Sequence, residues 1–440
     1  MARALPTGEN SSSMVDSWDR VAALHPMLRA RFDLTADPPR GEVRAEAPRS
    51  LATVDLSRLA KGVGDRVVPR LTARLQSSLD LAAGPVIRAV HLLLAGQRRR
   101  LFVVAHHLVI DAVSWRILLD DLSAVLASEE PGPGPGLPFA RWAEALMQLA
   151  QEGLVAEERE YWTEQAGAPA PRLSLDDAAA PEPVGNTMTE TLELGVADTE
   201  RLTRDLAGRL GVRPDEVLLA ALVRALEGDL GEARLRVMME GHGRHGEFFD
   251  LDLSRTVGWF TALYPLLLDL RFSAGPEEDL VLVRERLRGV PSGGVGYGLL
   301  RWGGATATDL RRGWVPPQVS FNYLGQLDAS LSGDVPFRLA PEEAGPHRDP
   351  AGLRPFRLEV SAQVLNGCLE VELAYGRGAL QDSRVRAWRD ALAAALDTYL
   401  SLSGRGESAV ADVSDFPDLE LRPAELDDLL MDLGDFGERP

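Results

Sequence analysis

Hydrophobic and polar residues alternate along this chain with two periods, one typical of helices and one typical of strands. Helical spacing covers residues 15–32 and predicts one long helix there, and residues 70–80 predict a second amphipathic helix. Two apolar runs at 86–95 and 101–106 flank a polar turn and predict a β-hairpin. Further helices are predicted at 113–126, 139–149 and 157–165.

A proline-rich segment at 167–185 divides the chain, because proline interrupts helices and sheets alike. We therefore predict a boundary between two lobes there. The second half repeats the mixture of helices and strands. Strands are predicted at 187–194, 235–240, 318–323, 356–364 and 368–375, and helices at 199–210, 214–227 and 383–400.

Composition narrows the class of protein. A chain of 440 residues is too long for one compact core and suits two or three. The formal net charge of −19 argues against a partner that is a nucleic acid or an anionic membrane. The single cysteine, Cys368, excludes an internal disulfide, and no apolar run reaches membrane length. We expect a soluble, acidic protein of the cytoplasm.

The first candidate for chemistry is a pair of histidines at the end of the predicted strand 101–106. His106 and His107 are followed by Asp111, which places an imidazole where a strand meets a helix. Histidine exchanges protons near neutral pH, so this position suits acid–base chemistry. The alternative is structural: two histidines at a strand end whose ring nitrogens bind the backbone.

The second candidate is Glu240, at the end of the apolar strand 235–240. Glycines on both sides of His242 allow a tight turn that leaves Glu240 facing a cavity. Burial would raise the pKa of such a carboxylate into a useful range for proton transfer. The alternative is a loop in solvent. His242 and His245 lack the accompanying cysteines or carboxylates of a metal site, so we predict no metal.

Three more stretches, 255–261, 293–298 and 320–326, are unusual for a core or a surface. The glycine cluster at 293–298 follows a Val-Pro-Ser sequence instead of a strand, so it does not predict a dinucleotide-binding loop. The chain also lacks the Gly-x-Ser-x-Gly and Gly-Lys-Ser/Thr motifs of hydrolases and phosphate-binding loops.

Taken in order, these motifs resemble those of the epimerization domains of nonribosomal peptide synthetases, which are members of the condensation-domain superfamily. Val-Ser-Trp after Asp111, Glu-Gly-His-Gly-Arg and Phe-Asn-Tyr-Leu-Gly distinguish epimerization domains from relatives that form peptide bonds. The chain departs from the family at Ala112, where the family has Gly, and at His245, where a Glu usually stands. The family's opening Pro-Ile-Gln motif is absent before residue 15. The matching stretches are 25–29, 106–116, 240–244, 255–260, 294–298 and 321–325.

The resemblance implies an α/β fold in which two chloramphenicol-acetyltransferase-like lobes form a V-shaped pseudo-dimer with a tunnel between them. The absent opening motif leads us to expect an open sheet edge on the first lobe. We expect a disordered start at 1–14, an N-terminal lobe at 15–170 that is truncated at its start, a linker at 171–185, a C-terminal lobe at 186–403 and an acidic tail at 404–440.

The resemblance also implies a reaction. The family acts on an aminoacyl or peptidyl thioester carried on the phosphopantetheine arm of a carrier domain, in antibiotic and other secondary metabolism. Glu240 and His107 are then the two groups that handle the Cα proton. Glu240 is expected as base, and His107 either as the acid on the opposite face or as a group that stabilises the enolate, and the sequence does not decide which residue is base and which is acid. Asn322 or Tyr323 is expected to donate a hydrogen bond to the enolate oxygen.

The remaining motif residues are expected to be structural. Asp111 and Arg244 are predicted to form an ion pair that holds the two motif loops together, and His106 to pack. Trp115, Trp259 and Phe260 are also expected to pack. The domain itself is expected to bind no cofactor, since the phosphopantetheine arrives on the carrier domain, and its other partners are synthetase modules.

Two other classes of function stay open. A condensation-type acyltransferase would use the same His107, but would show Trp-Ser after an Asp-Gly pair. A non-catalytic remnant or scaffold would explain the absent opening motif. The sequence leaves open which amino acid or peptide is the substrate.

Overall fold

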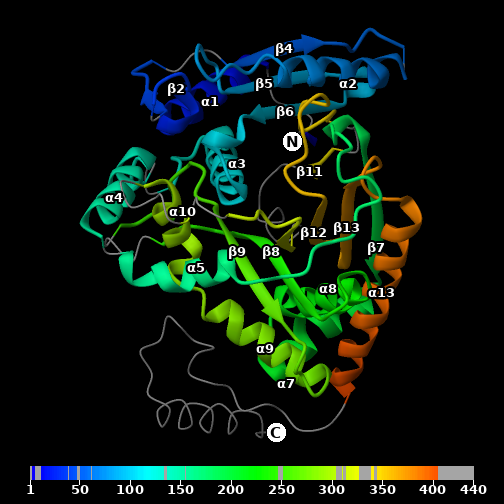
Figure 1. The fold of residues 1–440 in the computed structure, drawn as a ribbon. Helices are drawn as coiled ribbons and strands as arrows, with labels where there is room; N and C mark the ends of the chain where they lie inside the picture. Colours follow the sequence, from blue (N-terminus) through cyan, green and yellow to red (C-terminus); the bar gives the residue numbers. More distant parts are fainter. Residues whose placement is uncertain are drawn as a thin grey trace, which may run out of the picture.

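Two β-sheets with helices packed on them form the two lobes of the molecule (Figure 1). The computed structural model describes residues 2–4, 11–37, 39–46, 50–60, 62–132, 136–153, 155–245, 251–303, 310, 314–326, 338–340 and 344–404. The acidic tail expected at 404–440 lies outside the described residues, apart from Gly404 at its start.

The first lobe contains a five-stranded sheet in the order β11-β1-β6-β5-β4. The predicted hairpin is present as β5 (Ile87–Leu93) and β6 (Arg99–Ala105), which are antiparallel, and β4 (Leu51–Asp55) pairs with β5 in parallel. Alternate side chains of the hairpin face opposite sides of the sheet. One side packs on α1 (Ser11–Leu24) and α3 (Ala112–Leu126), and the other on α2 (Val63–Gln76).

Two expectations are wrong at the side of this sheet away from β4. The edge is not open, and the described residues of the expected disordered start at 1–14 belong to a strand and to the beginning of a helix. β1 (Ala2–Ala4) pairs with β6, and on its other side it pairs with β11 (Arg338–Leu339). A three-residue strand is held by main-chain hydrogen bonds and needs no apolar pattern, so the sequence contains no sign of it. Ser11, Ser12 and Ser13 begin α1, and Met14 is completely buried on that helix.

The helix predicted at 15–32 is shorter than expected. It ends at Leu24, because His25 precedes Pro26 and the residue before a proline disfavours helical backbone. The apolar residues that follow belong to a short 3₁₀-helix, η1 (Pro26–Arg29), and to β2 (Ala30–Asp33), which pairs with β3 (Arg40–Val43).

The second lobe contains a six-stranded sheet in the order β7-β13-β12-β10-β8-β9. β10 lies between β8 and β12 and is parallel to both, and the other pairs are antiparallel. Buried residues alternate along β12 and β13, so one face of the sheet packs on α8 (Pro214–Leu230) and α13 (Asp382–Leu400). The strands are β7 (Thr187–Leu194), β8 (Arg234–Gly241), β9 (Ala262–Asp269), β10 (Val319–Gln326), β12 (Leu358–Leu365) and β13 (Cys368–Gly376).

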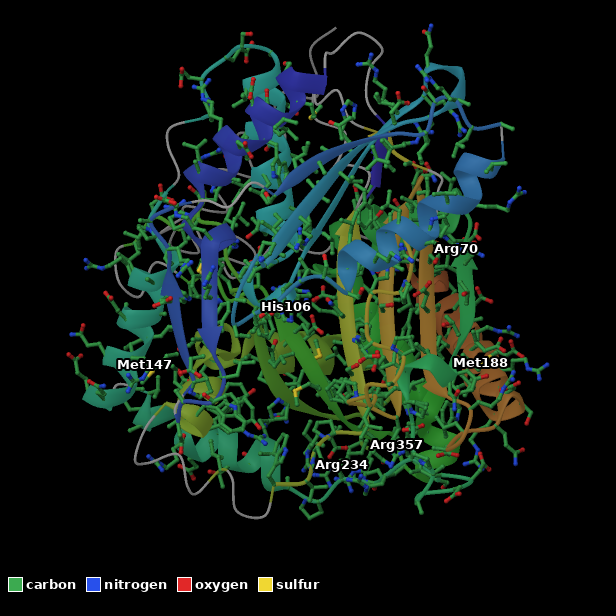
Figure 2. All side chains as sticks on the ribbon, turned by 90° about the horizontal axis from the view of Figure 1, so that it is seen from above. Arg70, His106, Met147, Met188, Arg234 and Arg357 are labelled. Carbon is green, nitrogen blue, oxygen red and sulfur yellow. The ribbon has the colours of Figure 1, made fainter. Side chains whose placement is uncertain are left out.

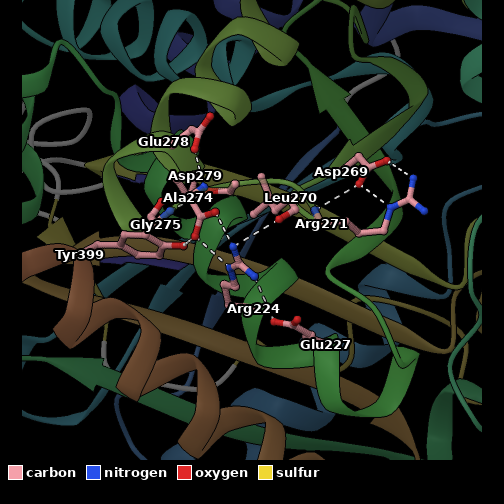
Figure 3. A network of polar contacts seen from close by, with 11 residues as sticks. Arg224, Glu227, Asp269, Leu270, Arg271, Ala274, Gly275, Glu278, Asp279 and Tyr399 are labelled. Carbon is pink, nitrogen blue, oxygen red and sulfur yellow. Dashed lines mark hydrogen bonds and ion pairs between the residues drawn. The ribbon is translucent and has the colours of Figure 1, made fainter.

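A buried polar network joins three helices behind this sheet (Figure 3). Arg224 of α8 donates two hydrogen bonds to Asp279 of α9 (Pro276–Arg288), at 2.9 and 2.6 Å. Tyr399 of α13 donates to the same carboxylate at 2.8 Å. Because Asp279 is almost completely buried, these partners are what make its charge tolerable in the core.

The boundary between the lobes differs from the expected one. Helix α5 (Arg159–Gly167) lies in the segment expected for the first lobe, but its Trp162 is fully buried in the core of the second. The Trp162 ring lies 5.7 Å from the ring of Tyr264 and 5.4 Å from that of Tyr297. The chain therefore joins the second lobe before the proline-rich segment. Prolines mark where regular structure stops, and they do not indicate which lobe the preceding helix packs on.

Candidate active site

Glu240 and Asn322 lie side by side at the ends of two parallel strands. The register pairs Phe321 of β10 with Met239 of β8, and both of these side chains are buried in the core. Since side chains alternate along a strand, Glu240 and Asn322 point together to the opposite face. The Asn322 amide donates a hydrogen bond of 2.8 Å to a carboxylate oxygen of Glu240.

The surroundings of Glu240 change its acidity. Its carboxylate is reachable by water but closely surrounded by protein, and this loss of bulk solvent raises its pKa above the ordinary value. Positive charge on His107, and after it on Arg348, lowers the pKa, and the charge on Glu359 raises it. The charge of His107, which belongs to the first lobe, thus acts on Glu240, which belongs to the second.

His107 is exposed at the junction that follows β6. Its ring centroid lies 5.7 Å from that of Trp259, with the rings inclined at 59°. His106 precedes it as the N-cap of the short 3₁₀-helix η3 (His107–Val109), and its Nδ1 accepts the N–H of Leu108 at 3.2 Å. Burial lowers the pKa of His106, with a smaller contribution from His107. Seen from above, His106 lies near the end of β6, over the strands of the second lobe (Figure 2).

An ion pair between Asp111 and Arg244 links the loops of the two lobes, as the sequence predicted. One nitrogen of Arg244 donates to both carboxylate oxygens of Asp111 at 2.9 Å, and both side chains are largely buried. Asp111 is also the N-cap of α3, where it accepts the N–H of Ser114 at 2.7 Å. The Arg244 guanidinium lies 4.1 Å above the ring centre of Phe260, so the motif at 255–261 packs on the same pair.

The glycine cluster at 293–298 has a steric role next to this site. Gly293 and Gly294 both have a positive φ, of 54° and 86°. A Cβ atom at Gly293 would lie 1.9 Å from the ring of His245, and one at Gly294 would lie 2.0 Å from that of Tyr264. The loop that carries His242 and His245 therefore packs against backbone at this point.

Tyr323 is separate from the other candidates. It follows Asn322, so it points to the opposite face of β10 and packs against the core of the second lobe. Burial raises its pKa, and the charge of Asp215 at the start of α8 adds to the effect. Of the two candidates for enolate stabilisation, only Asn322 lies beside Glu240.

The sequence analysis misses two residues at the site, Arg348 and Glu359, and gives a third, Trp259, only a packing role. Arg348 donates to both carboxylate oxygens of Glu359, at 3.1 and 3.0 Å, and both affect Glu240. Glu359 could have been found, because it alternates with the buried Leu358 and Val360 and so faces the site. Arg348 lies in a loop without a recognisable motif. Trp259 was expected only to pack, but it also contacts His107.

Two kinds of feature are absent from the described residues. In these ranges, His, Cys, Asp and Glu side chains form no group of three or more that could bind a metal ion. Of the helices in the described parts of the chain, none is both long enough and apolar enough to cross a membrane.

Comparison with known proteins gives a consistent picture. The family model described as "Condensation domain" matches residues 4–421. The chain is 35% identical over 382 residues to chondramide synthase cmdD of Chondromyces crocatus. The matched region covers 84% of the chain and 10% of that protein. It is 34% identical over 393 residues to surfactin synthase subunit 1 of Bacillus subtilis (strain 168), covering 87% of the chain and 11% of that protein. The chain thus spans about a tenth of these relatives.

Solved structures match over almost the whole chain. The epimerization domain from the third module of tyrocidine synthetase B superposes with a TM-score of 0.79 at 26% identity, covering 91% of each chain. The X-domain from teicoplanin biosynthesis superposes with a TM-score of 0.69 at 20% identity, covering 92% of this chain and 90% of that one. The expected fold, two chloramphenicol-acetyltransferase-like lobes, is confirmed.

Proposed function

The chain belongs to the condensation domain family, as a condensation-type domain of nonribosomal peptide synthetases, and from this premise we propose that it epimerises the Cα of an aminoacyl or peptidyl thioester. One observation carries the proposal: the Glu240 carboxylate, bound by Asn322 and facing His107, has a pKa raised by burial. A carboxylate of this kind suits the removal of a proton from carbon.

The two groups divide the reaction between them. Glu240 takes the Cα proton, the Cα–H bond breaks, and its electron pair moves into the thioester as an enolate. His107, on the other lobe, returns a proton to the opposite face of Cα, and both side chains then exchange protons with solvent. The reverse reaction uses the same groups in exchanged roles.

Asn322 supports this chemistry in two ways. One of its amide N–H groups holds the Glu240 carboxylate in place. The same amide has a second N–H that can donate to the enolate oxygen. Enolate stabilisation is therefore proposed for Asn322 and not for Tyr323, whose side chain lies on the other face of the strand.

The substrate reaches the site on a partner. We propose a carrier domain whose phosphopantetheine arm brings the thioester between the lobes, together with neighbouring synthetase modules, in the cytoplasm and in antibiotic or other secondary metabolism. In this proposal the chain binds no cofactor of its own, and neither nucleic acid nor a membrane is a partner.

Condensation-type acyl transfer is the second candidate, because the named relatives are whole synthetases and the same His107 could serve it. The residues after Asp111 favour epimerization, since Val113, Ser114 and Trp115 stand in the order that the epimerization domains show. Epimerization and acyl transfer give different products.

The decisive experiment presents the protein with an aminoacyl carrier domain in deuterated water. Epimerization replaces the Cα hydrogen with deuterium and yields both configurations, which mass spectrometry and chiral analysis of the released amino acid detect. Acyl transfer instead gives an amide when a second loaded carrier is added, without exchange at Cα. If neither product forms with any carrier, this result would support a non-catalytic scaffold.

A further inference from the structure

An apolar cavity of about 310 Å³ lies between α4 (Phe139–Glu152) and α10 (Val295–Trp302). Its size is at the lower end of the roughly 300–1,000 Å³ found for ligand pockets. Aromatic and aliphatic side chains dominate its wall, and none of the described residues that line it carries a charge. The catalytic proposal above does not use this cavity.

The cavity adjoins both of the proposed proton-transfer groups. Leu263, in its wall, is the register partner of Glu240 on the neighbouring strand, so the two side chains point to the same face of the sheet. Trp259, also in the wall, contacts the ring of His107. A Cα held between Glu240 and His107 therefore lies at the edge of this cavity.

We infer that the cavity receives the side chain of the aminoacyl group, and that the substrate is a large apolar amino acid; this inference rests on the proposed function. Besides its hydrogen, the reacting Cα carries an amino group, a thioester and a side chain. The first two are polar and lose hydrogen bonds in an apolar cavity. An aromatic or branched aliphatic side chain instead removes apolar surface from water there.

Gly298 offers a direct way to fill the cavity. It lies in α10 and lines the wall, and a Cβ atom built on it meets no heavy atom within 4 Å. The first carbon of a side chain at this position therefore meets open space. Gly228 of α8 provides the matched control, because it is also helical, has the same open space around its Cβ, and does not line the cavity.

The test measures binding separately from catalysis. Stable amide analogues of phenylalanyl-, alanyl- and aspartyl-phosphopantetheine are titrated against the whole chain, with the fluorescence of the wall tryptophans as the signal. We expect the Kd for the phenylalanyl analogue to be at least about tenfold below that for the alanyl one, and the aspartyl analogue to bind worst. The series Gly298→Ala, Gly298→Leu and Gly298→Phe should remove this preference step by step. Gly228→Phe should retain it.

The outcomes separate the two proposals. Equal affinity for the three analogues would overturn the inference, and so would an equal loss for all of them in Gly298→Phe, which would assign the cavity to the phosphopantetheine arm. Deuterium exchange is measured in parallel with the corresponding loaded carriers. A retained preference for the phenylalanyl analogue without exchange at Cα would support the cavity assignment and overturn the proposed reaction.

Discussion

Asn322 donates its side-chain hydrogen bond to Glu240 across 2.8 Å, although 82 residues separate the two in the chain. The contact exists because β8 and β10 are parallel neighbours, so that their carboxyl ends meet at one edge of the sheet. Two motifs that are far apart in the sequence thereby form one arrangement of polar groups. The predictions below test what this arrangement does.

Replacing Glu240 with Gln should reduce Cα deuterium exchange by about 10²–10⁴-fold, the usual contribution of a positioned acid or base. The amide is isosteric and its oxygen can still accept from Asn322, so the melting temperature should stay near that of the native protein. Glu193→Gln is a matched control, because Glu193 is exposed on the edge strand β7. Near-native exchange in Glu240→Gln would remove this carboxylate from the reaction.

The two adjacent histidines should respond differently. His107→Ala should lose Cα exchange, because its exposed ring contacts Trp259 and its charge acts on Glu240. His106→Ala should retain most exchange and should instead lower the melting temperature, since its ring caps a short helix. Comparable losses of exchange in both variants, with unchanged melting temperatures, would contradict the assignment of His107.

The acid side of the pH–rate profile should move in opposite directions in two variants. A base must be ionised, so exchange falls as the pH drops through the pKa of Glu240. Arg348 lowers that pKa and Glu359 raises it, with His107 as the remaining charged neighbour. Arg348→Gln should therefore shift the fall to higher pH, and Glu359→Gln should shift it to lower pH. A shift in the same direction for both variants would contradict this electrostatic account.

Breaking the buried ion pair should destabilise the protein strongly. Arg244→Met leaves the Asp111 carboxylate buried without its partner, which typically costs about 3–5 kcal/mol. Asp111→Asn should also lower the free energy of unfolding, and denaturant titration measures both. In the double variant the loss should be smaller than the sum of the two. Additive losses would mean that the two residues act independently.

The stability of the first lobe should decrease in acid because of His91. This residue is completely buried on β5, and both of its ring nitrogens lack a hydrogen-bond partner in the described structure. Burial, with a smaller effect from Arg99, lowers its pKa below 6.5. Below about pH 6.5 the unfolded chain therefore binds a proton that the folded chain does not, and the free energy of unfolding falls as the pH drops.

The variant His91→Leu isolates this contribution. It removes the titrating group, so its free energy of unfolding should change less between pH 7 and pH 5 than that of the native protein. The difference in slope should not exceed about 1.4 kcal/mol per pH unit. Identical slopes in the two proteins would assign the acid sensitivity to other groups.

Elements with a strong period were predictable from the sequence. The bounds of the hairpin β5–β6 and of helix α13 lie within two residues of the predicted ones, because a complete face of each element is buried. The helix predicted at 15–32 was too long, because the apolar residues after Pro26 continue a pattern that belongs to three different elements. Hydrophobicity indicates burial, but the proline decides where the helix ends.

The candidate site was predictable where a motif carries it. Glu240, His107 and the pair Asp111–Arg244 were all found in this way. The choice between Asn322 and Tyr323 could also have been made, because Phe321 is apolar and Tyr323 shares its face of the strand. Arg348 could not have been found, since it reaches Glu240 only through the folding of a loop that has no pattern of its own.

The strand β11 has a consequence for the order in which the molecule can be built. It supplies residues 338–339 to a sheet whose other four strands end by residue 105. At about 5–20 residues per second of synthesis, the outer edge of β1 waits on the order of tens of seconds for its partner. During translation the first lobe therefore exposes main-chain donors and acceptors that only the late part of the same chain can satisfy. A ribosome that stalls between the two lobes would leave a nascent chain with an open strand edge, which is the kind of surface that chaperones bind and that aggregation extends.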